Sequence, residues 1–262
     1  MIKKYAFGKV ISWMYVIKFQ KRGLPHCHSL FTLGNASKIR DNVDVDRAIC
    51  AKIPDPQVDL ELYMLVAKHI ICSPCGHLNP NSVCMKNGCC SKKFPRPFQQ
   101  GTVITEHSYP LYQRRDNGIV VQKHVGNQVI ELDNCFVVPY SPFLLKHFAA
   151  HINVEICSSI KSIKYMYKYL HKGHDTASIQ VTNDKTTANY DEVTTHQSTH
   201  YVAVSEAAWR IFEFKMHGIS HWILKLDIHL PGPSQYILTK MLLMKPEIVL
   251  LILIPCSWDG LN

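Results

Sequence analysis

The sequence has no apolar run long enough to cross a membrane as a helix, and no signal-peptide cleavage site. Its longest late apolar run, IVLLILIP from Ile248, is far shorter than the ~20 residues that a membrane-spanning helix needs. The N-terminal stretch MIKKYAFGKVISWMYVIKF has early lysines and apolar residues, but no small-residue cleavage site precedes the basic residues that follow it. We therefore expect an intracellular protein that is neither secreted nor inserted in a membrane.

The chain also lacks the glycine-rich loop GxxxxGK[ST] of nucleotide-hydrolysing motors, and it has no internal repeat or low-complexity tract. Acidic residues are fewer than basic ones: the chain has 20 Asp and Glu and 29 Lys and Arg, which gives a formal net charge of +9. This balance favours an anionic partner such as nucleic acid, although basic surfaces also serve solubility alone. The sequence thus excludes an NTPase motor in this chain and favours nucleic-acid binding.

The ten cysteines are unevenly spread, and five of them lie between Cys72 and Cys90. Such a cluster is more typical of metal binding than of a secreted disulfide framework. Four thiolates from two short loops can form the closed tetrahedral shell of a structural zinc site. The predicted ligands are Cys72, Cys75, Cys84 and Cys90, with Cys89 and His77 as spares. Buried or reduced thiols without a metal are the alternative.

The apolar pattern predicts an α+β fold in which helices pack on one face of an antiparallel sheet. KVISWMYVIKF and HCHSLFTLG, separated by the polar turn QKRGLP, are predicted to form a β-hairpin. Further strands are predicted at GIVVQKHV, QVIELD, CFVVPY and HINVEIC. Helices are predicted within 55–71, where Asp55 can cap the first turn, and in SSIKSIKYMYKYLHKG and VSEAAWRIFEFKMHG.

Two histidines, His26 and His28, begin the second strand of this hairpin. Residues i and i+2 of a strand share a face, so both imidazoles project together while Cys27 points the other way. Two neutral imidazoles on one face can chelate a divalent cation. About one such pair is nevertheless expected by chance among 15 histidines in 262 residues, so the motif alone is weak.

Two tyrosines, Tyr165 and Tyr169, are four residues apart in KYMYKYLHKGHD. On a helix they lie on one face about 6 Å apart along the axis, with lysines 164, 168 and 172 on a neighbouring stripe. Such tyrosines can attack a phosphodiester that cations hold in place. The alternative is an amphipathic helix whose tyrosines are half-buried in the core.

Eight motifs in order carry a resemblance to a known family: FQKRGLPHCH, CSKKFPRPF, YPLYQRRDNG, FVVPYSPFLL, HINVEIC, IKYMYKYLHKGHD, EAAWRIFEF and HLPG. Together they resemble the Helitron helicase-like N-terminal domain, the replication-initiator (Rep) nuclease module of rolling-circle transposons. The resemblance extends over residues 1–235, with a Cys-rich insertion at 69–98, and leaves 236–262 as a divergent tail.

The resemblance implies a His-hydrophobic-His (HUH) endonuclease that nicks and joins single-stranded DNA, and hence a nuclear protein. In such enzymes Mg²⁺ or Mn²⁺ on the histidine pair polarises the scissile phosphate, and a tyrosine attacks to give a 5′-phosphotyrosine. Carried over, His26 and His28 match the metal pair, and Tyr165 and Tyr169 match the nucleophiles.

Two imidazoles hold Mg²⁺ or Mn²⁺ poorly, so a third ligand with an oxygen donor is expected. Gln20 is the candidate, Glu155 and His151 are rivals, and an ordinary turn residue is the alternative for Gln20.

Several basic side chains are predicted to contact DNA phosphates, with Phe94, Phe98 and Tyr109 near enough to stack bases. They are Lys92, Lys93, Arg96, Arg114 and Arg115, together with Lys168 and Lys172. Solvated basic loops are an equally good reading of these residues.

The sequence also departs from the family pattern. The strand ending in an FxTxT-like motif, which precedes the hairpin in the family, has no counterpart here, so we expect the sheet to lose a strand and expose an edge. Lys18 stands where the family usually has Glu, which would weaken metal binding. The helicase that normally follows in the same polypeptide is also expected to be absent. We therefore expect a truncated copy with weakened activity, or an inactive DNA-binding or zinc-stabilised interaction protein.

Overall fold

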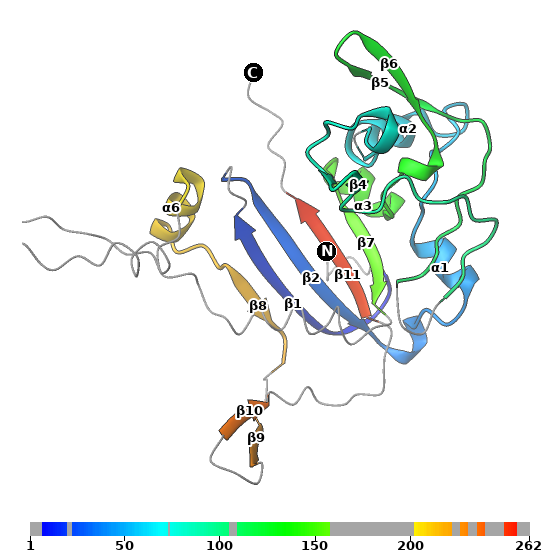
Figure 1. The fold of residues 1–262 in the computed structure, drawn as a ribbon. Helices are drawn as coiled ribbons and strands as arrows, with labels where there is room; N and C mark the ends of the chain where they lie inside the picture. Colours follow the sequence, from blue (N-terminus) through cyan, green and yellow to red (C-terminus); the bar gives the residue numbers. More distant parts are fainter. Residues whose placement is uncertain are drawn as a thin grey trace, which may run out of the picture.

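The computed structural model describes residues 7–19, 23–72, 74–104, 109–157 and 202–221, and the backbone of three strands at 226–229, 235–238 and 249–255. A five-stranded antiparallel sheet forms its centre, in the order β7–β11–β2–β1–β8 (Figure 1). These strands are β1 Val10–Phe19, β2 Pro25–Leu33, β7 Asn153–Cys157, β8 His217–Ile219 and β11 Val249–Pro255. The mixed helix and strand content confirms the predicted α+β class.

Strand β2 is paired on both edges, with β1 on one side and β11 on the other. The hairpin of β1 and β2 has the predicted alternation, with Val16 opposite His28 and Ile17 opposite Cys27. Strand β11 comes from the segment predicted to be a divergent tail. It pairs with the edge of β2 that faces away from β1, so the backbone hydrogen-bonding groups on both sides of β2 have partners.

One face of the sheet packs on helices α1 (Asn42–Ala48) and α3 (Pro142–Phe148). Alternate residues of the strands point to this face, and its buried cluster includes Phe31, Val154 and Ile156 of β2 and β7. Apolar side chains of the two helices, Val45 and Leu144 among them, complete the cluster. The histidines of β2 therefore lie on the opposite face of the sheet.

Helix α6 (Val204–Ile211) lies against the turn that precedes β2. The Ser205 hydroxyl donates a hydrogen bond to the carbonyl of Gly23, and the Trp209 ring lies edge-on to Phe19, with centroids 5.9 Å apart. Gly23 has a φ of +80°, and a Cβ there would lie 2.9 Å from the Cβ of Ala203. Close packing and backbone conformation thus both require glycine at this turn.

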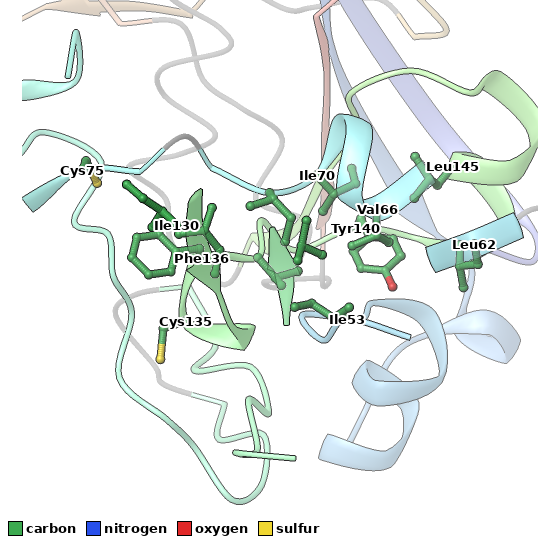
Figure 2. Close-up of a cluster of buried hydrophobic side chains, with 14 of the residues drawn as sticks. Ile53, Leu62, Val66, Ile70, Cys75, Ile130, Cys135, Phe136, Tyr140 and Leu145 are labelled. Carbon is green, nitrogen blue, oxygen red and sulfur yellow. The ribbon is translucent and has the colours of Figure 1, made fainter. Parts of the chain in front are cut away.

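A second buried cluster lies beyond β7, around helix α2 (Leu60–His69) and the hairpin of β5 (Val121–Val125) and β6 (Gln128–Leu132) (Figure 1). Figure 2 shows Leu62 and Leu145 at one end of this cluster and Cys75 at the other. Two short hairpins complete the strands: β3 (Met85–Lys86) with β4 (Cys89–Cys90), and β9 (Leu226–His229) with β10 (Gln235–Leu238).

Three elements differ from their sequence prediction. The predicted helix VSEAAWRIFEFKMHG ends at Ile211, and its last two residues instead begin strand β8. Helix α2 begins four residues later than expected, because Asp55 caps a separate turn and the carboxylate of Asp59 accepts the capping bond from the amide of Leu62. The predicted strand CFVVPY instead contains a 3₁₀ turn (Asn134–Phe136) followed by isolated bridges. The predicted helix SSIKSIKYMYKYLHKG lies outside the described residues. None of the described helices has the length and apolar character needed to cross a membrane.

A buried arginine joins three segments beside the second cluster. Arg114 is 5% exposed, and its Nη1 donates to the carbonyls of Asn134 at 2.8 Å and Val137 at 2.6 Å. The amide side chain of Asn134 extends the network, since it accepts from the backbone of Ile53 and donates to the carbonyl of Arg115. These bonds satisfy backbone groups that the fold removes from water.

We predict that Arg114→Ala lowers the free energy of unfolding by about 3 kcal/mol, because it leaves buried carbonyls without a donor. The exposed neighbour provides a matched control, and Arg115→Ala should change stability by less than about 0.5 kcal/mol. Urea unfolding followed by circular dichroism measures both values. Equal effects of the two substitutions would contradict the structural role of Arg114.

Candidate metal sites and the histidine face

The structure places the imidazoles of His26 and His28 side by side on β2. Their ring centroids are 4.7 Å apart, and His28 is 8% exposed. In the backbone register Lys18 of β1 lies opposite His26. Cys27 belongs to the other face, where its sulfur lies 3.3 Å from the hydroxyl of Ser29. The two rings and the lysine thus occupy one face of the central strands.

Burial and positive charge keep both imidazoles neutral at neutral pH. Burial lowers the pKa of His28 to about 4, and the neighbouring His26 and Lys18 act in the same direction. Burial also lowers the pKa of His26, with Lys18 as the next cause. Neutral imidazole is the form that ligates a metal. Lys18, however, opposes any cation that approaches the pair.

The described residues do not complete a site for Mg²⁺ or Mn²⁺ around this pair. They contain no group of three or more His, Cys, Asp or Glu ligands there. Gln20 lies outside the described residues, and the Nδ1 of His151 lies against the carbonyl of His69 instead. The histidines therefore supply two ligands for a cation that favours oxygen donors.

Glu155, the other rival for the third ligand, belongs to a different cluster. Strand β11 separates β7 from β2, so two strand spacings of about 4.8 Å each lie between Glu155 and the histidine strand. Burial raises the pKa of Glu155 to about 7, against the opposing effects of Tyr112, Arg96 and Arg114. Its carboxyl group thus lies among these three side chains.

The register adds one histidine that the sequence interpretation missed. His217 of β8 is opposite Val16, and Val16 is opposite His28 on its other side. Since directly opposed residues share a face, His217 lies on the histidine face and is exposed there. β8 has only three residues, so no local pattern marks it as a strand beside β1.

Three of the four predicted zinc ligands converge. The sulfur atoms of Cys75, Cys84 and Cys90 all lie within 4.8 Å of one another. The tight turn between β3 and β4 brings the last two together, with Asn87 and Gly88 both at positive φ. The group can hold a metal, and three soft sulfur donors fit zinc. Cys72 is outside this group but near enough to interact electrostatically with Cys84 and Cys90, so its role as a ligand stays a prediction.

Backbone amides support the thiolate form of Cys90. Burial raises its pKa, but hydrogen bonds from the backbone of Phe94 and Lys92, together with those of Cys75 and Cys84, lower it overall. Burial raises the pKa of Cys75, and the neighbouring Cys90 and Cys84 act in the same direction. Amide donors to a cysteine sulfur orient and stabilise a metal-bound thiolate. The arrangement is therefore one that could hold a metal ion.

The predicted DNA-contact residues have different surroundings. Lys93, Arg96 and Arg115 are exposed. Lys92 is also exposed but interacts with the thiol of Cys72, and Arg114 is buried with its guanidinium bound to carbonyls, which favours a structural role. The remaining predicted site residues, Tyr165, Tyr169, Lys168 and Lys172, lie outside the described residues.

Comparison with known proteins finds one family model that matches the start of the chain. A model described as the Helitron helicase-like domain at the N-terminus matches residues 1–31, a range that includes both histidines of β2. The match supports a Helitron helicase-like N-terminal domain, and it suggests a transposon-related function and an interaction with DNA. No curated protein matches the chain.

We predict about one zinc ion per purified chain, bound by the cysteine group. Replacing Cys75 and Cys84 together by serine should remove the metal, whereas Cys89→Ser should keep it, because Cys89 is exposed and outside the group. Elemental analysis measures the content, and Cys72→Ser tests the fourth position. Zinc retained by the double variant would refute the site.

Proposed function

We propose that this chain is a Rep-type endonuclease that nicks and joins single-stranded DNA during rolling-circle transposition. The observation that carries the proposal is the neutral pair of His26 and His28 on the central strand β2, within the segment that matches the Helitron family. The net charge of +9 supports an anionic substrate.

In this proposal a tyrosine is the nucleophile. The phenol oxygen of Tyr165 or Tyr169 attacks the phosphorus, and the bond to the 3′ oxygen breaks. The phenol proton leaves to solvent and the 3′ oxygen takes up a proton, so the products are a 5′-phosphotyrosine and a free 3′-hydroxyl. A phenolate is a better leaving group than an alkoxide, since the pKa of tyrosine is near 10, and the link therefore stays reversible for joining.

The histidine pair would position the substrate phosphate. A divalent cation held by His26 and His28, with further ligands outside the described residues such as Gln20, would supply Lewis-acid polarisation of that phosphate. Lys18 lies beside the pair and disfavours the cation. The activity of this chain should therefore be weak.

The second candidate is a catalytically inactive, transposon-derived protein that binds DNA or acts as a zinc-stabilised interaction module. Two observations favour it: the cation of Lys18 at the histidine pair, and the incomplete ligand set among the described residues. The cysteine group and the exposed basic side chains would retain their roles without the nuclease.

A denaturing gel of labelled single-stranded oligonucleotide separates the two candidates. We predict a faint covalent protein–DNA adduct that requires Mg²⁺ or Mn²⁺ and disappears in Tyr165→Phe/Tyr169→Phe and in His26→Ala. Lys18→Glu should raise the rate about tenfold, because it replaces repulsion of the cation by attraction. His124→Ala, on the exposed hairpin of β5 and β6, is the control and should match the unmodified chain.

Two results would contradict the nuclease. The first is no adduct from Lys18→Glu at any metal concentration, which favours the inactive protein. The second is an adduct that persists in the double tyrosine variant, which would refute the assigned nucleophiles.

A further inference from the structure

We infer that a metal ion at Cys75, Cys84 and Cys90 holds the adjoining loop, residues 91–98, in a conformation that binds single-stranded DNA. This loop is called the basic loop below. The inference rests on the proposed function for the identity of the partner, and it adds a metal-dependent step to DNA binding. Its basis is the way in which the cysteine group and the loop share hydrogen bonds.

The first half of the basic loop is bound to the cysteines. The sulfur of Cys90 accepts hydrogen bonds from the amides of Lys92 and Phe94, and the carbonyl of Cys90 accepts one from Lys93 at 2.8 Å. The amide of Ser91 donates to the carbonyl of Cys84 at 2.8 Å. Each of these bonds depends on the position of a cysteine that belongs to the metal-binding group.

The second half of the loop is attached to the core. The amide of Arg96 donates to the carbonyl of Cys135 at 2.9 Å, and its guanidinium donates to the carbonyl of Lys92. Lys93 has a φ of +60°, a left-handed conformation that a lysine adopts only when its surroundings impose it. The loop conformation is thus imposed by its attachments rather than by local preference.

The side chains that this loop exposes suit single-stranded nucleic acid. Lys93 and Arg96 are exposed cations, and the ring of Phe98 is 41% exposed. The Arg96 guanidinium lies 5.5 Å from the centre of the Phe94 ring, which orients it by a cation–π contact. Cations that hold phosphates beside an aromatic ring that stacks a base are the usual elements of such a binding surface.

Geometry explains why the metal matters to this loop. The sulfur atoms of the cysteine group lie within 4.8 Å of one another, so one metal ion bound to all three fixes Cys90 relative to Cys75 and Cys84. Lys92 and Lys123 interact with the nearby thiol of Cys72, so they add positive charge on the cysteine side. Lys93 and Arg96 are then the exposed cations of the basic loop that can contact DNA phosphates. Without the metal, Cys90 loses its fixed position, and so do the amides that bind to it.

The test is a cycle of DNA affinities measured by fluorescence anisotropy with labelled oligothymidylate. Chelation of zinc should weaken binding about tenfold in the unmodified chain and in Arg47→Ala, a control at an exposed residue of α1. In Lys93→Ala/Arg96→Ala, chelation should change the affinity less than twofold. The slope of log affinity against log salt concentration should be shallower by about 1.4 in this double variant, because each lost phosphate contact with a single strand removes about 0.7.

Hydrogen exchange on the same samples shows whether the effect is local. Chelation should expose the amides of Lys92 and Phe94 while those of β1 and β2 keep their protection. Exposure of the sheet amides as well would overturn the inference, because the metal would then hold the whole domain. Unchanged DNA affinity on chelation would overturn it and leave the proposed function intact. No DNA binding by the zinc-loaded chain would overturn both.

Discussion

The double pairing of β2 is the constraint on which the rest of the structure depends. With β1 on one edge and β11 on the other, this strand cannot shift by one residue without turning every side chain to the wrong face. The register directs Phe31 and Leu33 to the cluster beneath α1 and α3. The same register directs His26 and His28 to the opposite face. Core packing and the candidate site are therefore two consequences of one alignment.

Beyond β7 the fold depends on short-range geometry instead. The turn at Asn87 and Gly88 brings Cys84 and Cys90 together, and Cys75 reaches them from the end of the second buried cluster. Small clusters of this kind gain stability from a metal, because binding energy becomes folding energy. The chain thus combines a sheet that positions imidazoles with a cysteine group that positions a basic loop.

Local patterns in the sequence were enough to predict the hairpin of β1 and β2, the strands β5, β6 and β7, and the start of helix α6. They did not predict where α6 ends, because the last residues of the predicted helix belong to strand β8. Cysteine spacing was likewise enough to predict the group of Cys75, Cys84 and Cys90. The pairing of β11 with β2 was not predictable, because the two segments are more than 200 residues apart and no local sequence pattern marks them as partners. Arg114 is buried because its guanidinium binds the carbonyls of Ala51, Asn134 and Val137. These partners are far away in the sequence, so no local pattern separates Arg114 from the exposed Arg115. His217 could not be predicted to lie beside His26 and His28 either, since only the pairing of β8 with β1 places it on that face.

We propose that the imidazoles of His26 and His28 form a cation site on β2. Titration with Mn²⁺ while histidine side-chain NMR signals are recorded tests it most directly, since the paramagnetic ion broadens the resonances of nearby nuclei. We predict that His26 and His28 broaden first, and that Lys18→Glu shifts this broadening to lower Mn²⁺ concentration. Uniform broadening of all histidines, including exposed His124 and His221, would contradict a cation site on β2.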